Sequence, residues 1–91
     1  MNKCFELIIE GRVQGVGFRN FAYMRALKYN IKGYVKNTFE GNVEILCTGE
    51  DGNLDKFINE MRKGPSFCFI SKLSVNEAPS GSGIDNFEIR Y

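Results

Sequence analysis

The chain alternates between two kinds of hydrophobic spacing, and the order of these segments limits the folds open to it. Residues 3–10 alternate apolar and polar side chains, as a half-buried strand does. Residues 18–29 place apolar side chains at helical spacing, with Asn30 as a helix stop. Two further strands are expected over 31–38 and 42–48, joined by a short turn that contains a glycine.

The second half of the chain follows the same order of helix and strand. Residues 53–63 carry an amphipathic stripe, and Gly64 with Pro65 ends it as expected for a helix C-terminus. Residues 67–78 are strand-like, Pro79–Gly83 reads as a loop, and a short last strand follows it. The order β-α-β-β-α-β, plus one strand, predicts an α+β fold. In it an antiparallel sheet is covered on one face by two helices.

Length and charge narrow the possible functions. The 91 residues, 43% of them hydrophobic, suffice for a single domain, 1–91. Twelve basic and eleven acidic residues are scattered along the chain, whereas nucleic-acid binders carry a basic excess. No run reaches the roughly 20 apolar residues of a membrane span, and acidic residues interrupt the N-terminal apolar stretch. We therefore expect a cytoplasmic monomer without a nucleic-acid or membrane partner.

The cysteine and histidine counts exclude several chemistries. Cys4, Cys47 and Cys68 are an odd set without a CxxC pair, so we expect reduced cysteines that serve as small strand residues. The chain has no histidine, which excludes Ser-His-Asp and Cys-His catalysis and histidine-bound zinc. Any chemistry must use arginine, lysine, asparagine, carboxylates or backbone groups.

A glycine-rich run, Gly11–Arg19, joins the first strand to the first helix. Glycine N–H groups can close around an anion, and a helix N-terminus adds partial positive charge. Arg19 in the first helical turn opposes the helix dipole, a conflict that a bound anion would remove. The run lacks the Gly-Lys-Ser/Thr ending of a P-loop and the third glycine of a dinucleotide fingerprint. It is therefore either a small phosphate or carboxylate site, or a turn that simply needs glycines.

Asn37 is the second candidate for a functional side chain. An asparagine just ahead of a glycine-containing hairpin is commonly a turn former. Strand alternation, however, places Asn37 on the face of Val35, toward the helices and the start of the first helix. There its amide could hold a water in line with a bound anion. The spacing leaves both interpretations open.

Two segments together resemble the signatures of the acylphosphatase family. The first is Ile9–Arg19, and the second is Gly33–Val43 followed by Gly49. Residue types, spacing and chain length all agree with that family. The resemblance implies a ferredoxin-like fold and the hydrolysis of a small acyl phosphate to a carboxylate and inorganic phosphate, without metal or cofactor.

The resemblance also implies roles for individual residues. Arg19 is implied to be a catalytic, phosphate-binding arginine, and Asn37 to position the attacking water. No metal ligand is implied. The phosphate cradle is implied to consist of the backbone amides of Gln14, Gly15, Val16, Gly17 and Phe18.

The chemistry so implied needs few groups, and other functions on the same plan remain to be weighed. An acyl phosphate releases a stable carboxylate, so no acid is required, and charge neutralisation with placement of water suffices. One alternative is a non-catalytic small-anion module, including a domain of a larger carbamoyl-transfer protein, which the short chain argues against. Another is an RNA-binding domain, disfavoured because Glu6 and Glu10 lie on the expected open face of the sheet.

Overall fold

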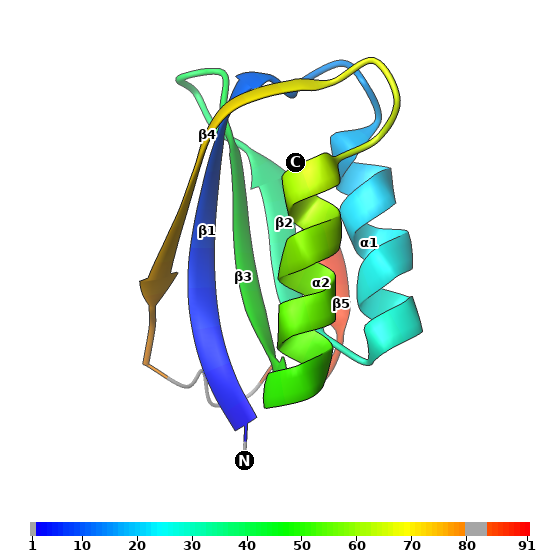
Figure 1. Ribbon diagram of the computed structural model, residues 1–91, viewed down its shortest axis with the longest axis vertical. Coiled ribbons are helices and arrows are strands. Elements are labelled where there is room, and N and C mark those ends of the chain that lie inside the picture. The colour runs from blue at the N-terminus through cyan, green and yellow to red at the C-terminus, as the bar shows by residue number, and fades with distance from the viewer. Residues whose placement is uncertain (1, 80–83) are drawn as a thin grey trace.

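The computed structural model describes residues 2–79 and 84–91 as two layers, a twisted sheet and a pair of helices (Figure 1). The predicted order of helices and strands is confirmed, although α2 begins at Asp51 rather than at Asn53. Of the loop expected over Pro79–Gly83, residues 80–83 lie outside the described part of the chain. The elements are β1 (Asn2–Arg12), α1 (Phe18–Tyr29), β2 (Lys32–Asn37), β3 (Val43–Glu50), α2 (Asp51–Lys63), β4 (Phe69–Glu77) and β5 (Phe87–Arg90).

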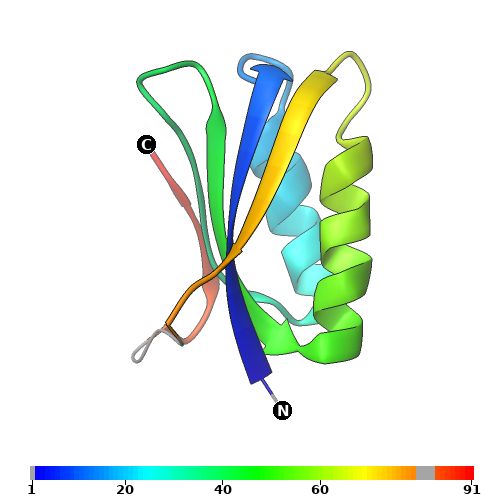
Figure 2. The same ribbon diagram turned by 60° about the vertical axis from the view of Figure 1, so that its left-hand side comes forward.

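The sheet has the strand order β4-β1-β3-β2-β5, and both helices cover the same face of it (Figure 2). Strand β1 pairs antiparallel with β3 and β4, and β2 pairs antiparallel with β3, as predicted. Strand β5 is the exception, because it pairs parallel with β2 and makes the sheet mixed. Since β4 runs opposite to β1 and the chain reverses after β4, β5 returns in the direction that β2 already has.

The core lies between the helices and the sheet. The apolar stripes predicted for the two helices are their buried faces, and the strands contribute alternate residues to the same layer. The buried thiol of Cys47 belongs to this layer, whereas Cys68 is only partly buried. Buried core residues include Leu7, Ile9, Phe18, Ala22, Ala26, Val35, Val43, Ile45, Leu54, Phe57 and Met61.

Two connections and one strand end meet at the same end of the molecule. The β1–α1 loop and the β2–β3 turn lie at the same end (Figures 1 and 2). Strand β5 runs parallel to β2 and so points toward this end as well. Asn30 ends α1 in the left-handed conformation, with φ 56°, and its N–H donates to carbonyls of the last helical turn. The stop predicted at this residue is confirmed, and the following strand β2 is thereby directed back to the site end.

Candidate active site

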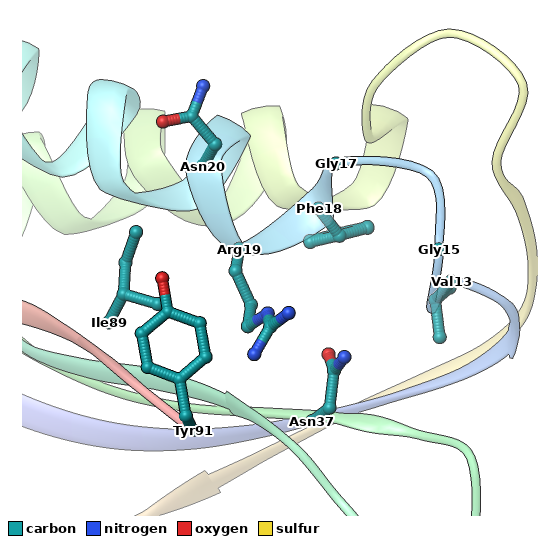
Figure 3. Close-up of a pocket in the computed structure, with 9 residues that line it drawn as sticks. All are labelled: Val13, Gly15, Gly17, Phe18, Arg19, Asn20, Asn37, Ile89 and Tyr91. Carbon is teal, nitrogen blue, oxygen red and sulfur yellow. The ribbon is translucent and has the colours of Figure 1, made fainter.

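A cavity of about 230 Å³ opens where the start of α1 faces the end of β2 and β5 (Figure 3). It is small beside the roughly 300–1,000 Å³ of sites that hold drug-sized ligands, so it suits a small anion with a short substituent. The loop and helix contribute Val13, Gly15, Gly17, Phe18, Arg19 and Asn20, and the sheet side contributes Asn37, Ile89 and Tyr91.

The glycines of the β1–α1 loop take backbone conformations that other residues avoid. Gly15 has φ +75° and Gly17 has φ +81°, with Val16 between them outside this left-handed region. Such alternation turns successive N–H groups toward one side and forms a concavity for an anion. A Cβ added at either glycine would meet no atom within 4 Å apart from those of the residue itself and its chain neighbours. The space before these two glycines, which line the cavity, is therefore open to a ligand.

Among residues 2–79 and 84–91, no side chain caps the first amides of helix α1. Gly17 is its N-cap residue, no side chain caps it, and its first turn contains no acidic residue. The amide hydrogens and the partial positive charge at this end thus remain available to an anion. The buried ring of Phe18, packed edge-on against Phe21 at 5.9 Å, fixes the helix start against the core.

Arg19 supplies the positive charge of the cavity. Its guanidinium extends toward Asn37 (Figure 3). Within residues 2–79 and 84–91, Arg19 has neither an ion-pair nor a hydrogen-bond partner, and no carboxylate side chain lines the cavity. Its one recorded side-chain interaction is with the ring of Tyr91, whose centroid lies 4.6 Å from Cζ. The guanidinium charge is therefore not neutralised by the described part of the protein.

Asn37, the last residue of β2, faces Arg19 across the cavity, and its amide points toward the guanidinium (Figure 3). It shares a sheet face with Val35, which is fully buried beneath the helices, as the alternation predicted. The hydrogen bonds of the β2–β3 turn come from the next residue. Thr38 N–H donates to the Asn42 carbonyl at 2.9 Å, and its carbonyl accepts from Gly41 N–H at 3.2 Å. Thr38 is thus the turn-forming residue, and the amide of Asn37 is left for the cavity.

Gln14 ties the glycine-rich loop to the hairpin that follows Asn37. Its side-chain Nε2 donates to the Thr38 carbonyl at 2.8 Å and to the Asn42 carbonyl at 2.9 Å. Its side chain does not line the cavity, and neither does that of Val16, which packs against the core. The structure therefore brings Gly15, Gly17, Phe18, Arg19 and Asn37 to the cavity and places Gln14 as a bridge behind it.

Ile89 and Tyr91 complete the cavity, and neither is among the site residues predicted from the sequence. A signal was present in the alternation of Phe87, Ile89 and Tyr91, since every second residue of a strand faces the same side. Phe87 is buried in the core, so Ile89 must lie on the same helix-covered face, and Tyr91 is the next alternate position, just past the strand. Parity alone does not say, however, that this edge strand runs alongside Asn37.

The sequence and fold can be compared with known proteins. The family model described as acylphosphatase matches residues 5–89. The chain belongs to the acylphosphatase family. An acylphosphatase of Bacillus subtilis is 41% identical over 87 residues, which are 96% of either chain. An acylphosphatase of Thermotoga maritima is 39% identical over 89 residues, or 98% of either chain. These comparisons support acylphosphatase, an enzyme, as the function.

Solved structures agree with the acylphosphatase assignment. The crystal structure of the Bacillus subtilis acylphosphatase superposes with a TM-score of 0.93 at 41% identity and covers all of both chains. The fold is therefore the ferredoxin-like α+β fold of that structure. The structure of full-length HypF in its phosphate- and nucleotide-bound form matches with a TM-score of 0.93 at 34% identity, over all of this chain but 12% of HypF. An acylphosphatase-like unit thus also occurs within a much larger protein.

The structure of this acylphosphatase also bears on metal binding and on membrane crossing. Among the residues that the structure describes, no three His, Cys, Asp or Glu side chains lie close enough together to hold a metal ion. No helix in the same residues has the length and apolar character needed to cross a membrane.

Proposed function

We propose that this chain hydrolyses small acyl phosphates in the cavity between Arg19 and Asn37. One observation carries the assignment of roles. Arg19 and Asn37 face each other beside the uncapped start of helix α1. In the described chain Arg19 has no carboxylate partner, and the amide of Asn37 does not form the neighbouring turn. Cationic, donor-rich surroundings of this kind suit a phosphoryl group, and the facing amide suits a water molecule.

Arg19 and the loop amides would hold the phosphoryl group. The planar guanidinium has paired N–H donors that match two phosphoryl oxygens, and the backbone amides from Gln14 to Phe18 would donate to the remaining oxygen. In the transition state, as in the ground state, the phosphoryl oxygens share the negative charge. Donors already fixed around them stabilise that charge without reorganising during the reaction.

Asn37 would place the attacking water. Its side-chain carbonyl can accept a hydrogen bond from water, while its NH₂ group can donate to the water oxygen or to the phosphoryl group. The water oxygen bonds to phosphorus as the bond from phosphorus to the acyl oxygen breaks. The carboxylate leaves with that electron pair, and the proton of the water passes to phosphate or solvent. A loose transition state asks little of the nucleophile, so no strong base is needed.

The same chemistry explains why the cavity contains no acid. A carboxylate is a stable leaving group and does not need protonation, unlike the alkoxide of a phosphate monoester. The chain has no histidine. Among the described residues no carboxylate side chain lines the cavity, so none of them would compete with the substrate for Arg19. We therefore propose that the activity is independent of metal ions.

The test compares turnover with phosphate binding in matched variants. We expect hydrolysis of benzoyl phosphate or acetyl phosphate that a chelator does not diminish. Arg19→Ala should weaken both phosphate binding and turnover, whereas Asn37→Ala should lose turnover and retain phosphate. Arg12→Ala removes an exposed arginine of the preceding strand and serves as the control. Full activity in Arg19→Ala refutes the proposed role of that residue.

The similarity to a short part of HypF supports one alternative function, a phosphate-binding module without catalytic activity. A non-catalytic phosphate-binding module would bind phosphate and resist heat in its presence, yet release no carboxylate from an acyl phosphate. Absence of turnover in the unmodified chain, with phosphate binding intact, would favour that alternative over the enzyme.

Location and oligomeric state belong to the same proposal. We place the protein in the cytoplasm as a monomer that acts on small molecules, without a nucleic-acid or membrane partner. In support of the cytoplasmic location, Cys4, Cys47 and Cys68 are free, as cysteines are in a reducing compartment. Sedimentation of the purified chain with and without phosphate tests the monomer.

A further inference from the structure

Tyr91 is the side chain that the structure records in contact with the guanidinium of Arg19. The ring centroid lies 4.6 Å from Arg19 Cζ, within the range of a cation–π interaction. The ring lines the same cavity as Asn37, and Figure 3 shows it beside the guanidinium rather than between Arg19 and Asn37. Tyr91 directly follows β5, whose pairing with β2 ends at Arg90, and its side chain is exposed.

Two other arginines pack on rings, and the comparison sets Arg19 apart. Arg25 lies over the ring of Phe21 at 4.4 Å, and its Nε also donates to Glu60 at 2.7 Å. Arg90 lies over the Tyr34 ring at 4.0 Å, and its Nε also donates to Glu88 at 2.8 Å. Each of these arginines is thus held by a ring and a carboxylate together. For Arg19, the chain described over 2–79 and 84–91 provides the ring alone.

A ring and a carboxylate have different consequences for an arginine that must bind an anion. A carboxylate accepts hydrogen bonds from the guanidinium edge and neutralises its charge, so it competes with a phosphoryl group. An aromatic ring attracts the cation through its π face and accepts no hydrogen bond from the edge N–H groups. It restricts the many rotamers of the arginine, yet leaves its donors and charge for the ligand.

We propose that Tyr91 is a positioning residue for Arg19. Its ring holds the guanidinium toward the glycine-rich loop before the anion arrives, so less rotamer freedom is lost on binding. This inference rests on the proposed function, since it takes the phosphoryl group as the ligand of Arg19. The aromatic ring carries the role, and the phenol hydroxyl does not.

The experiment measures the affinity for inorganic phosphate and kcat/KM for benzoyl phosphate in matched variants. Tyr91→Leu should weaken phosphate binding by about two- to fivefold and lower kcat/KM in parallel, as expected for the loss of an exposed cation–π contact. Tyr91→Phe, which retains the ring, should match the unmodified chain. Tyr34→Leu removes a ring from another arginine, away from the cavity, and should leave both quantities unchanged.

The outcomes separate this inference from the function on which it rests. If Arg19→Ala binds phosphate as before, the proposed function fails. If Arg19→Ala loses phosphate but Tyr91→Leu retains it, the positioning role alone is refuted. A change in the KM for benzoyl phosphate without a change in phosphate affinity also refutes it, because the ring would then contact the acyl group. Equal losses in Tyr91→Phe and Tyr91→Leu would assign the effect to the hydroxyl.

Discussion

Replacing Gln14 by leucine tests whether the bridge behind the cavity holds Asn37 in place. The side chain of Gln14 donates to the carbonyls of Thr38 and Asn42, at 2.8 and 2.9 Å, and so links the β1–α1 loop to the β2–β3 hairpin. Leucine has a similar volume but no donor, so Gln14→Leu removes both hydrogen bonds, and the two carbonyls keep only their hydrogen bonds within the turn. At about 0.5–1.5 kcal/mol for each hydrogen bond, the free energy of unfolding should fall by roughly 1–3 kcal/mol.

The larger expected effect is on turnover. Asn37 immediately precedes the hairpin that Gln14 holds, and a shift of about 1 Å in a catalytic group can cost up to roughly 10²-fold in rate. We expect kcat to fall about ten- to a hundredfold on that scale. Phosphate affinity should change far less, because Arg19 and the start of α1 are held by Phe18 and the core rather than by Gln14.

The assays are steady-state hydrolysis of benzoyl phosphate, calorimetric titration with phosphate, and urea unfolding. Ile58→Val is a matched control, because it lies in α2, outside the cavity, and costs about 0.5–1.5 kcal/mol of stability. That variant should lose stability without losing turnover. An unchanged kcat in Gln14→Leu, or an equal loss of kcat in Ile58→Val, would show that the bridge does not position Asn37.

Three further predictions concern the fold. A Cβ at Gly33, where φ is +141°, would overlap a carbonyl oxygen of β3, so Gly33→Ala should lower the free energy of unfolding by about 2–4 kcal/mol in urea titrations. Burial raises the pKa of the Cys47 thiol to about 12, so it should resist a thiol reagent in the native state; the partly buried Cys68 should react first, and Cys68→Ser should remove that fast phase. The hydrogen bond from Arg25 lowers the pKa of Glu60 from its usual 4.5, so the folded state favours the carboxylate. The contribution of the Glu60 carboxylate to stability is present above pH 4.5 and is lost as the pH falls through the lowered pKa. The difference in the free energy of unfolding between Glu60→Gln and the unmodified chain should therefore shrink on acidification. A difference that persists in strong acid would contradict this assignment.

The elements of the fold could be predicted because their signals are local. Leu54, Phe57 and Met61 mark one face of α2, and alternation places Val35 and Asn37 on one face of β2, as the structure shows. The direction of β5 was missed, because it depends on which edge of the sheet is vacant after β4 has paired. That edge is a property of the assembled sheet and has no local signature in four residues.

In the candidate site, too, the features with local signals could be predicted, and the contacts between residues distant in the sequence could not. The positive φ of Gly15 and Gly17 is a local requirement, so a concavity that depends on these glycines could be predicted from the sequence. The hydrogen bonds of Gln14 join residues 24 and 28 positions apart in the chain, and the contact between Arg19 and Tyr91 joins the first helix to the residue after the last strand. Such pairs depend on strand register and edge pairing, which local patterning does not determine. The roles of Arg19 and Asn37 themselves stay predictions for the assays above.

The edge position of β5 affects how readily the cavity opens in the folded protein. Strand β5 pairs with β2 over only four residues, and an edge strand is held on one side alone. Short elements of this kind open at a free energy below that of global unfolding. Opening of β5 would carry Ile89 and Tyr91 out of the cavity while the other four strands keep their pairing. Amide exchange at β5 would then report the population of a folded but poorly binding state, and added phosphate should slow that exchange before it affects the central strands.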